Sequence, residues 1–205
     1  MAVNKNYIRS FCTIQKNTVF LNGEAVFTTE EDSFAGFSKK AYQHFEINYP
    51  KFFKMDNLSK LAFLGAELLL ATADENSAES NTALVFANKS SSLDTDVKYQ
   101  NSISDSENYY PSPAVFVYTL PNICLGEISI KHQLKSENSF FIFADYDPVF
   151  MENYCNILLE TQKADKVLCG WVEYYNEEYK AFLYLVDKKG GTEHNHKQLK
   201  KLYNK

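Results

Sequence analysis

The stretch that decides the fold is "SFFIFADYDPVFMENY", residues 139–154. An apolar segment typical of a strand runs into a short polar turn, and an apolar stripe typical of a helix follows. We expect Asp147 to be the N-cap of this helix and Pro148 to occupy its first turn, because both residue types favour these positions. The turn between strand and helix is where many α/β enzymes carry a nucleophile, and here it carries an acid, Asp145.

The segments before this stretch alternate between strand and helix patterns. Asn22-Gly23 separates two short apolar runs and predicts a type I′ hairpin turn. A helical stripe follows, with Asp56 as its expected cap, and a buried strand is predicted at 82–88. The stripe consists of Leu58, Leu61, Ala62, Gly65, Ala66 and Leu69. Residues 89–111 are polar and show no clear periodicity, so we expect a loop-like excursion within the domain.

The segments after it complete the pattern. Two helical pieces are expected on either side of Leu120-Pro121, since proline ends one helix and can begin the next. Two strands are predicted in residues 165–175 and 180–187, joined by the polar turn "NEE". The order predicts an α/β domain with a mostly parallel five-stranded sheet, helices on both faces and an antiparallel last strand. We assign residues 1–190 to one domain and 191–205 to a polar, basic C-terminal tail.

Composition and charge narrow the function classes. The formal net charge is −5 and the pI is about 5.4, which argues against a nucleic-acid partner. No apolar run of about 18 residues could span a membrane, and the N-terminus lacks a secretory pattern, so a cytoplasmic location is expected. Four separated cysteines are interpreted as small buried apolar residues. No cofactor and no metal site is indicated.

Two further segments resemble the N-terminal half of a β-ketoacyl synthase, a member of the thiolase-like superfamily. "LPNICLGEISIKHQL" resembles the family pattern P/V-N-x-x-A-G-x-x-A/T-I-x-x-G-L, and "KADKVLCGWVE" resembles G-x-A-D-x-x-x-A-G-G-x-E. The resemblance is specific from Ser112 to Glu173 and extends over about four fifths of the chain. It points to short synthase-like proteins of bacterial aryl-polyene or related polyketide clusters.

The resemblance implies that the catalytic residues of a synthase are absent. Where the family has T-A-C-S/T-S-G, with the acyl-accepting Cys, this chain has residues 143–148, "FADYDP", so Asp145 takes the nucleophile position. A carboxylate is a poor nucleophile toward a thioester, and it does not store an acyl group. The family's active-site histidine pair lies in a C-terminal half that is absent from this short form. His194 and His196 lie in the polar tail and are not expected to replace that pair.

Two functional hypotheses follow. The first is a non-catalytic subunit, similar to a chain length factor, in a fatty-acid, polyketide or aryl-polyene pathway. The family builds its dimer on the strand before the nucleophile, so we expect Phe140, Phe141 and Phe143 at an interface, in a homodimer or in a heterodimer with a full-length ketosynthase. An acyl-carrier protein is a further candidate partner. The second hypothesis is a small acyl-carrier-protein decarboxylase or thioesterase that uses Asp145; otherwise Asp145 has a structural role at the helix N-terminus.

Overall fold

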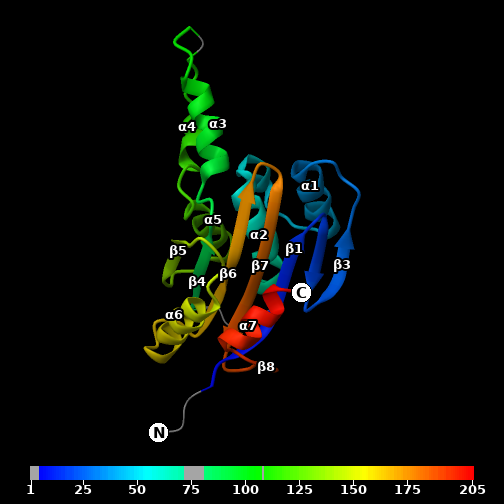
Figure 1. Cartoon of the computed structure of the whole chain (residues 1–205), viewed down its shortest axis with the longest axis vertical. Helices are drawn as coiled ribbons and strands as arrows, with labels where there is room; N and C mark the ends of the chain where they lie inside the picture. The colour runs from blue at the N-terminus through cyan, green and yellow to red at the C-terminus, as the bar shows by residue number, and fades with distance from the viewer. Residues whose placement is uncertain (1–4, 72–80, 108) are drawn as a thin grey trace.

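A mixed eight-stranded sheet with helices on both faces forms the body of the protein in the computed structural model, which describes residues 5–71, 81–107 and 109–205 (Figure 1). The strand order is β3-β2-β1-β7-β6-β4-β5, and β8 pairs with β1. The strands are β1 (Tyr7–Gln15), β2 (Thr18–Leu21), β3 (Glu24–Thr28), β4 (Thr82–Asn88), β5 (Asn138–Ile142), β6 (Lys166–Tyr175), β7 (Glu178–Asp187) and β8 (Thr192–Glu193).

The helices follow in chain order. They are α1 (Phe34–His44), the 3-10 turn η1 (Pro50–Lys54), α2 (Asn57–Leu70), α3 (Leu93–Ile103), α4 (Pro113–Val117), α5 (Ile123–His132), α6 (Pro148–Glu160) and α7 (His196–Tyr203). Asp56 is the N-cap of α2, and its carboxylate accepts a hydrogen bond of 2.9 Å from the backbone N–H of Ser59. The stripe predicted for this helix is confirmed, because all six of its residues are buried.

The prediction of a mostly parallel, five-stranded sheet is wrong. Only the pairings of β4 with β5 and with β6 are parallel, and the other pairings are antiparallel. The reason lies in the connections, since a two-residue turn can join only antiparallel strands. Such turns occur at Lys16-Asn17, Asn22-Gly23 and Asn176-Glu177, each with two positive φ angles. The first two add a three-stranded antiparallel meander to the sheet, and the third makes β6 and β7 a hairpin.

Two hydrophobic cores lie on opposite faces of the sheet. The larger one packs α1, α2 and α5 against the sheet, with Phe37, Leu61, Phe63 and Leu125 fully buried. The smaller one lies under α6 and α7 and contains Met151, Cys155 and Leu199. All four cysteines are buried and unpaired, as the sequence predicts.

The C-terminal residues are folded, which corrects the expectation of a polar tail from residue 191. Strand β8 pairs with β1, and α7 packs beside α6. The helix buries Leu199 and Leu202, and His194 just before it is only 4% exposed. The spacing of these two leucines and Tyr203 makes the helix amphipathic, so its apolar side can join the smaller core.

Residues 89–111 also differ from the expectation, because α3 occupies much of a segment read as a loop. The helix pairs with α4 to form an arm (residues 93–107 and 109–120) that projects beyond the sheet (Figure 1). Its polar composition gives it few buried side chains, since only Thr95 of α3 is buried. This explains why the sequence showed no apolar periodicity there.

Gly170 in the middle of β6 provides a test of the sheet. Its φ is 157°, and a Cβ atom there would overlap the carbonyl oxygen of Phe182 on β7. We predict that Gly170→Ala lowers the free energy of unfolding by more than about 2 kcal/mol. Chemical denaturation of the purified variants measures the effect.

Gly126→Ala is the matched control, because Gly126 lies within α5 and nothing would lie within 4 Å of its Cβ. There alanine should stabilise the protein by roughly 1 kcal/mol through its higher helix propensity. Equal effects of the two substitutions would show that β6 and β7 do not approach each other closely at Gly170.

Candidate functional site

The turn that carries Asp145 lies at the carboxyl ends of the three parallel strands. Asp147 is the N-cap of α6, and its Oδ1 accepts hydrogen bonds of 3.0 Å from the backbone N–H groups of Val149 and Phe150. Pro148 occupies the first turn, where its missing N–H leaves no donor unsatisfied. The turn is therefore fixed by Asp147, and Asp145 takes no part in capping the helix.

Asp145 lines an open cavity of about 500 Å³. Aromatic and charged side chains from the end of β4, from the same turn and from β6, β7 and α7 form the remaining walls. They include Lys89, Tyr146, Trp171, Glu173, Lys180 and Tyr203. The carboxylate of Asp145 is exposed and makes no hydrogen bond or ion pair with another described residue. The cavity thus contains the free carboxylate of Asp145 next to aromatic rings, and the exposed Glu178 contributes a second carboxylate to its lining.

Two of the other charged groups of the cavity, Glu173 and Lys180, have structural partners. Glu173 accepts hydrogen bonds from the backbone N–H groups of Lys89 and Ser90, at 2.7 and 3.1 Å. Lys180 donates a hydrogen bond of 2.8 Å to the carbonyl oxygen of Tyr203 and lies over the ring of that residue, 3.9 Å from its centroid. Burial lowers the pKa of Lys180. Burial, followed by the charge of Asp145, raises the pKa of Tyr203.

No histidine lines this cavity among the described residues. His194 is buried, and burial lowers the pKa of its imidazole to about 4. His196 lies at the start of α7, where its Nδ1 is 2.7 Å from Glu152. The two histidines therefore do not converge on Asp145. Among the described residues, the cavity therefore lacks a histidine that could act with Asp145 as a paired acid and base.

The three phenylalanines around β5 are held by their own chain. Phe140 packs against the larger core, whereas Phe141 and Phe143 pack against the smaller one. The rings of Phe141 and Phe143 lie against Phe150 of α6, with centroid distances of 4.7 and 4.9 Å. All three side chains are half-buried. The rings pack against the two cores and are not fully exposed at the sheet edge.

The backbone of β5 forms one edge of the sheet, because β5 is the last strand in the described order. Leu84 donates to the carbonyl of Glu137, and Phe143 donates to the carbonyl of Asn88, so residues 137, 139, 141 and 143 direct their backbone groups toward β4. Because these directions alternate along a strand, the N–H and C=O groups of Asn138, Phe140 and Ile142 point outward. The side chain of Ile142 is 49% exposed beside them.

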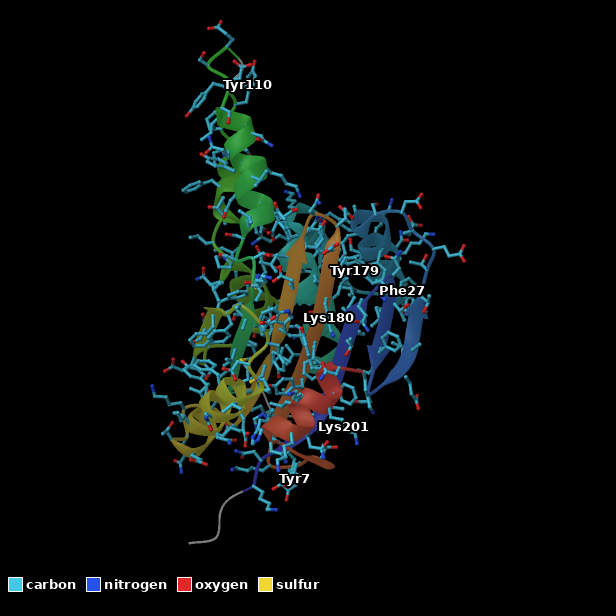
Figure 2. All side chains as sticks on the ribbon, viewed as in Figure 1. Tyr7, Phe27, Tyr110, Tyr179, Lys180 and Lys201 are labelled. Atoms are coloured by element: carbon cyan, nitrogen blue, oxygen red, sulfur yellow. The ribbon has the colours of Figure 1, made fainter. Side chains whose placement is uncertain are left out.

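The arm provides a second surface, which the sequence analysis missed. Large apolar side chains on it are between 42 and 74% exposed. They are Leu93, Val97, Tyr109, Tyr110, Phe116, Val117 and Leu120. The Tyr-Tyr pair and the run around Phe116 were available signals, but the polar residues around them masked the pattern. Figure 2 shows Tyr110 near the tip of the arm, far from the body of the protein.

The base of the arm is anchored by hydrogen bonds. The Ser92 hydroxyl donates to the Thr119 carbonyl at 2.6 Å, and the Thr95 hydroxyl donates to Asp56 at 2.9 Å. The Tyr118 hydroxyl donates at 2.9 Å to the buried Glu127, which also pairs with Lys51 at 2.8 Å. The arm is thus a fixed element whose exposed apolar surface does not fold back onto the body.

Comparisons with known proteins place this architecture in a fold class. No family model matches the chain, and no curated protein matches it by sequence. The ishigamide ketosynthase/chain length factor structure is similar, with a TM-score of 0.67 and 18% identity over 89% of this chain and 62% of that chain. The chain thus spans less than two thirds of the length of that match.

Two other solved structures are also similar to this chain. A ketosynthase in complex with its chain length factor from Xenorhabdus doucetiae matches with a TM-score of 0.59 and 14% identity, over 91% of this chain and 80% of that chain. A beta-ketoacyl synthase from Burkholderia phymatum matches with a TM-score of 0.61 and 10% identity, over 91% of this chain and 60% of that chain. The chain therefore has a ketosynthase-like fold of the thiolase-like type.

The capping geometry gives a prediction that separates the two acids of the turn. Asp147→Ala should lower the free energy of unfolding by about 1 kcal/mol, because two N–H groups of α6 lose their acceptor. Asp145→Ala should change it by less than about 0.5 kcal/mol, since its carboxylate has no partner among the described residues. Urea denaturation of both variants is the measurement. A larger loss for Asp145→Ala would contradict the assignment of the cap.

Proposed function

We propose that the chain is a non-catalytic ketosynthase-like subunit that pairs with a full-length ketosynthase, in the manner of a chain length factor. The observation that carries the proposal is the combination of an open sheet edge at β5 and an anchored arm with an exposed apolar surface. Such edges and patches are normally covered by a partner, because both favour non-specific association when they are left open. The pathway would be a bacterial fatty-acid, polyketide or aryl-polyene pathway.

The solved structures support a heterodimer over a homodimer. The ishigamide structure is titled as a ketosynthase/chain length factor, and the Xenorhabdus structure as a ketosynthase in complex with its chain length factor. In Figure 1 the arm projects above the side of the sheet that carries β4 and β5, so one partner could contact both surfaces. A third similar structure contains an acyl-carrier protein with its ketosynthase, so a carrier protein is a further proposed partner.

The composition of the cavity supports the absence of catalysis. Asp145 and Glu178 have no hydrogen-bond or ionic partner among the described residues, and Glu173 and Lys180 are bound to the backbone of their own chain. Among the described residues that line the cavity there is no cysteine and no histidine, whereas a condensing enzyme needs a thiol nucleophile and an assisting base. No helix of the described residues is long and apolar enough to cross a membrane. The cytoplasmic location expected from the sequence stays part of the proposal.

The pairing surface can be tested with charges placed on it. Ile142→Lys and Phe116→Lys should each weaken association with the full-length ketosynthase of the same host by at least about tenfold, because each buries an unpaired ammonium group. Both side chains are about half exposed, so the fold should tolerate the changes. Sedimentation velocity of the mixed proteins measures association, and thermal melts check folding.

Val26→Lys is the control, since Val26 lies on β3 at the opposite edge of the sheet and is 37% exposed. It should leave association unchanged. A wild-type chain that stays monomeric both alone and with the ketosynthase would overturn the proposed function.

The absence of catalysis is tested with malonyl-loaded carrier protein and mass spectrometry. We predict no elongation and no loss of carbon dioxide above the blank, for the wild type and for Asp145→Cys alike. The thiol of the variant would be a nucleophile, but no described histidine lies in the cavity to assist the extender unit. Carbon dioxide release that Asp145→Asn abolishes would instead support a decarboxylase.

A further inference from the structure

The outer face of α7 carries a cluster of lysines in a chain that is otherwise acidic. Residues 196–205, "HKQLKKLYNK", contain four lysines and no acid, whereas the whole chain has a net charge of −5. Lys197, Lys200 and Lys201 are exposed and lie on one face of the helix, at spacings of three and four residues. None of them makes an ion pair or hydrogen bond through its side chain with another described residue. Figure 2 shows Lys201 on the outer side of α7.

The apolar face of the same helix is already occupied. Leu199 and Leu202 are buried in the smaller core, and the ring of Tyr203 stacks on Tyr146 with a centroid distance of 4.6 Å. A basic amphipathic helix binds a membrane by inserting its apolar face. Because that face is packed against the sheet, α7 presents only charge, and a protein surface suits it better than a lipid bilayer.

Helix stability explains only part of the cluster. Lys200 and Lys201 lie in the last turn, where positive charge interacts favourably with the helix dipole. Lys197 lies in the first turn, where the same dipole makes a positive charge unfavourable. The neighbouring His196 contacts Glu152 of α6. Lys197 itself forms no ion pair with a described residue of α6. Its placement therefore suggests an external negative partner.

The position of α7 adds a second observation. Tyr203 belongs to this helix and also lines the cavity of Asp145. The lysine face and the cavity are therefore neighbours on the same side of the sheet, and the β5 edge lies at the end of the sheet order. A partner bound to α7 would lie beside the cavity and would leave the proposed ketosynthase surface free.

We propose that the face formed by Lys197, Lys200 and Lys201 is a docking surface for an acidic protein of the acyl-carrier type. The location of the surface rests on the charges and packing of α7. The choice of a carrier protein as its acidic partner rests on the proposed function. Charge complementarity of this kind gives fast association that weakens as salt increases.

A titration with the apo acyl-carrier protein of the same host tests the proposal. All four native cysteines are buried, so a fluorophore attached to Asn204→Cys, which is exposed, would report binding selectively. The labelled protein should bind the carrier, and Lys197→Glu, Lys200→Glu and Lys201→Glu combined should weaken binding by at least about tenfold. Raising the salt concentration from about 0.05 to 0.3 M should weaken wild-type binding as well.

The control variant reverses the same number of charges elsewhere. Lys16, Lys39 and Lys54 are exposed, and none is in an ion pair among the described residues, so their combined change to Glu should leave carrier binding within about twofold of wild type. Equal losses in the two variants would overturn the proposal, as would the absence of any carrier binding. Tighter binding of the wild type to phosphatidylserine vesicles or to duplex DNA than to the carrier would also overturn it.

Sedimentation of the same variants with the ketosynthase separates this inference from the proposed function. The α7 variant should still pair with the ketosynthase, because its changes lie away from β5 and the arm. A chain that pairs with the ketosynthase but does not bind the carrier refutes only the docking surface. A chain that binds the carrier through α7 but does not pair with a ketosynthase refutes only the proposed function.

Discussion

Strand β4 is the constraint on which the site depends, because all seven of its residues are buried. It pairs in parallel with β5 on one side and β6 on the other, so the carboxyl ends of the three strands meet at one edge. That arrangement brings Asp145 after β5, Lys89 after β4 and Glu173 of β6 around one cavity. The hydrogen bonds from Lys89 and Ser90 to Glu173 then fix the end of β4 against β6. A shift of β4 by one residue would reverse its side chains between the two cores and separate these groups.

The smaller core shows why the C-terminal helix matters to the site. Without α7, only α6 would cover that face of the sheet among the described helices, and Tyr146 and Phe182 would lose their contacts with the ring of Tyr203. The hydroxyls of Tyr146 and Tyr184 are buried here without a hydrogen-bond partner of regular geometry among the described residues, and burial raises the pKa of both. Unpartnered groups of this kind cost stability, so the surrounding apolar contacts must outweigh them. The helix therefore shapes the cavity wall as well as closing the core.

Much of this architecture could be read from local patterns. The Asn22-Gly23 turn, the apolar stripe of α2 and the buried run of β4 depend on short-range rules, and the structure shows each of them. The direction of most strands could not be read in this way, because pairing partners are distant in sequence. The arm and α7 were missed for a related reason. Both carry a few apolar residues among many polar ones, and only the fold determines whether those residues are buried, as in α7, or exposed, as on the arm.

The candidate site, too, could be predicted only in part from local sequence patterns. The sequence placed Asp145 and Asp147 in one turn, but it could not show that Asp147 binds the helix N-terminus and that Asp145 has no hydrogen-bond partner in the described part of the chain. It placed three phenylalanines near an edge strand, but their rings turn inward, and the backbone of β5 becomes the open feature. A strand edge, an apolar arm and a lysine face are all properties of the outer surface. None of the three uses the side chain of Asp145, and neither does the cap of α6, so the proposed associations and the helix N-terminus do not depend on that carboxylate.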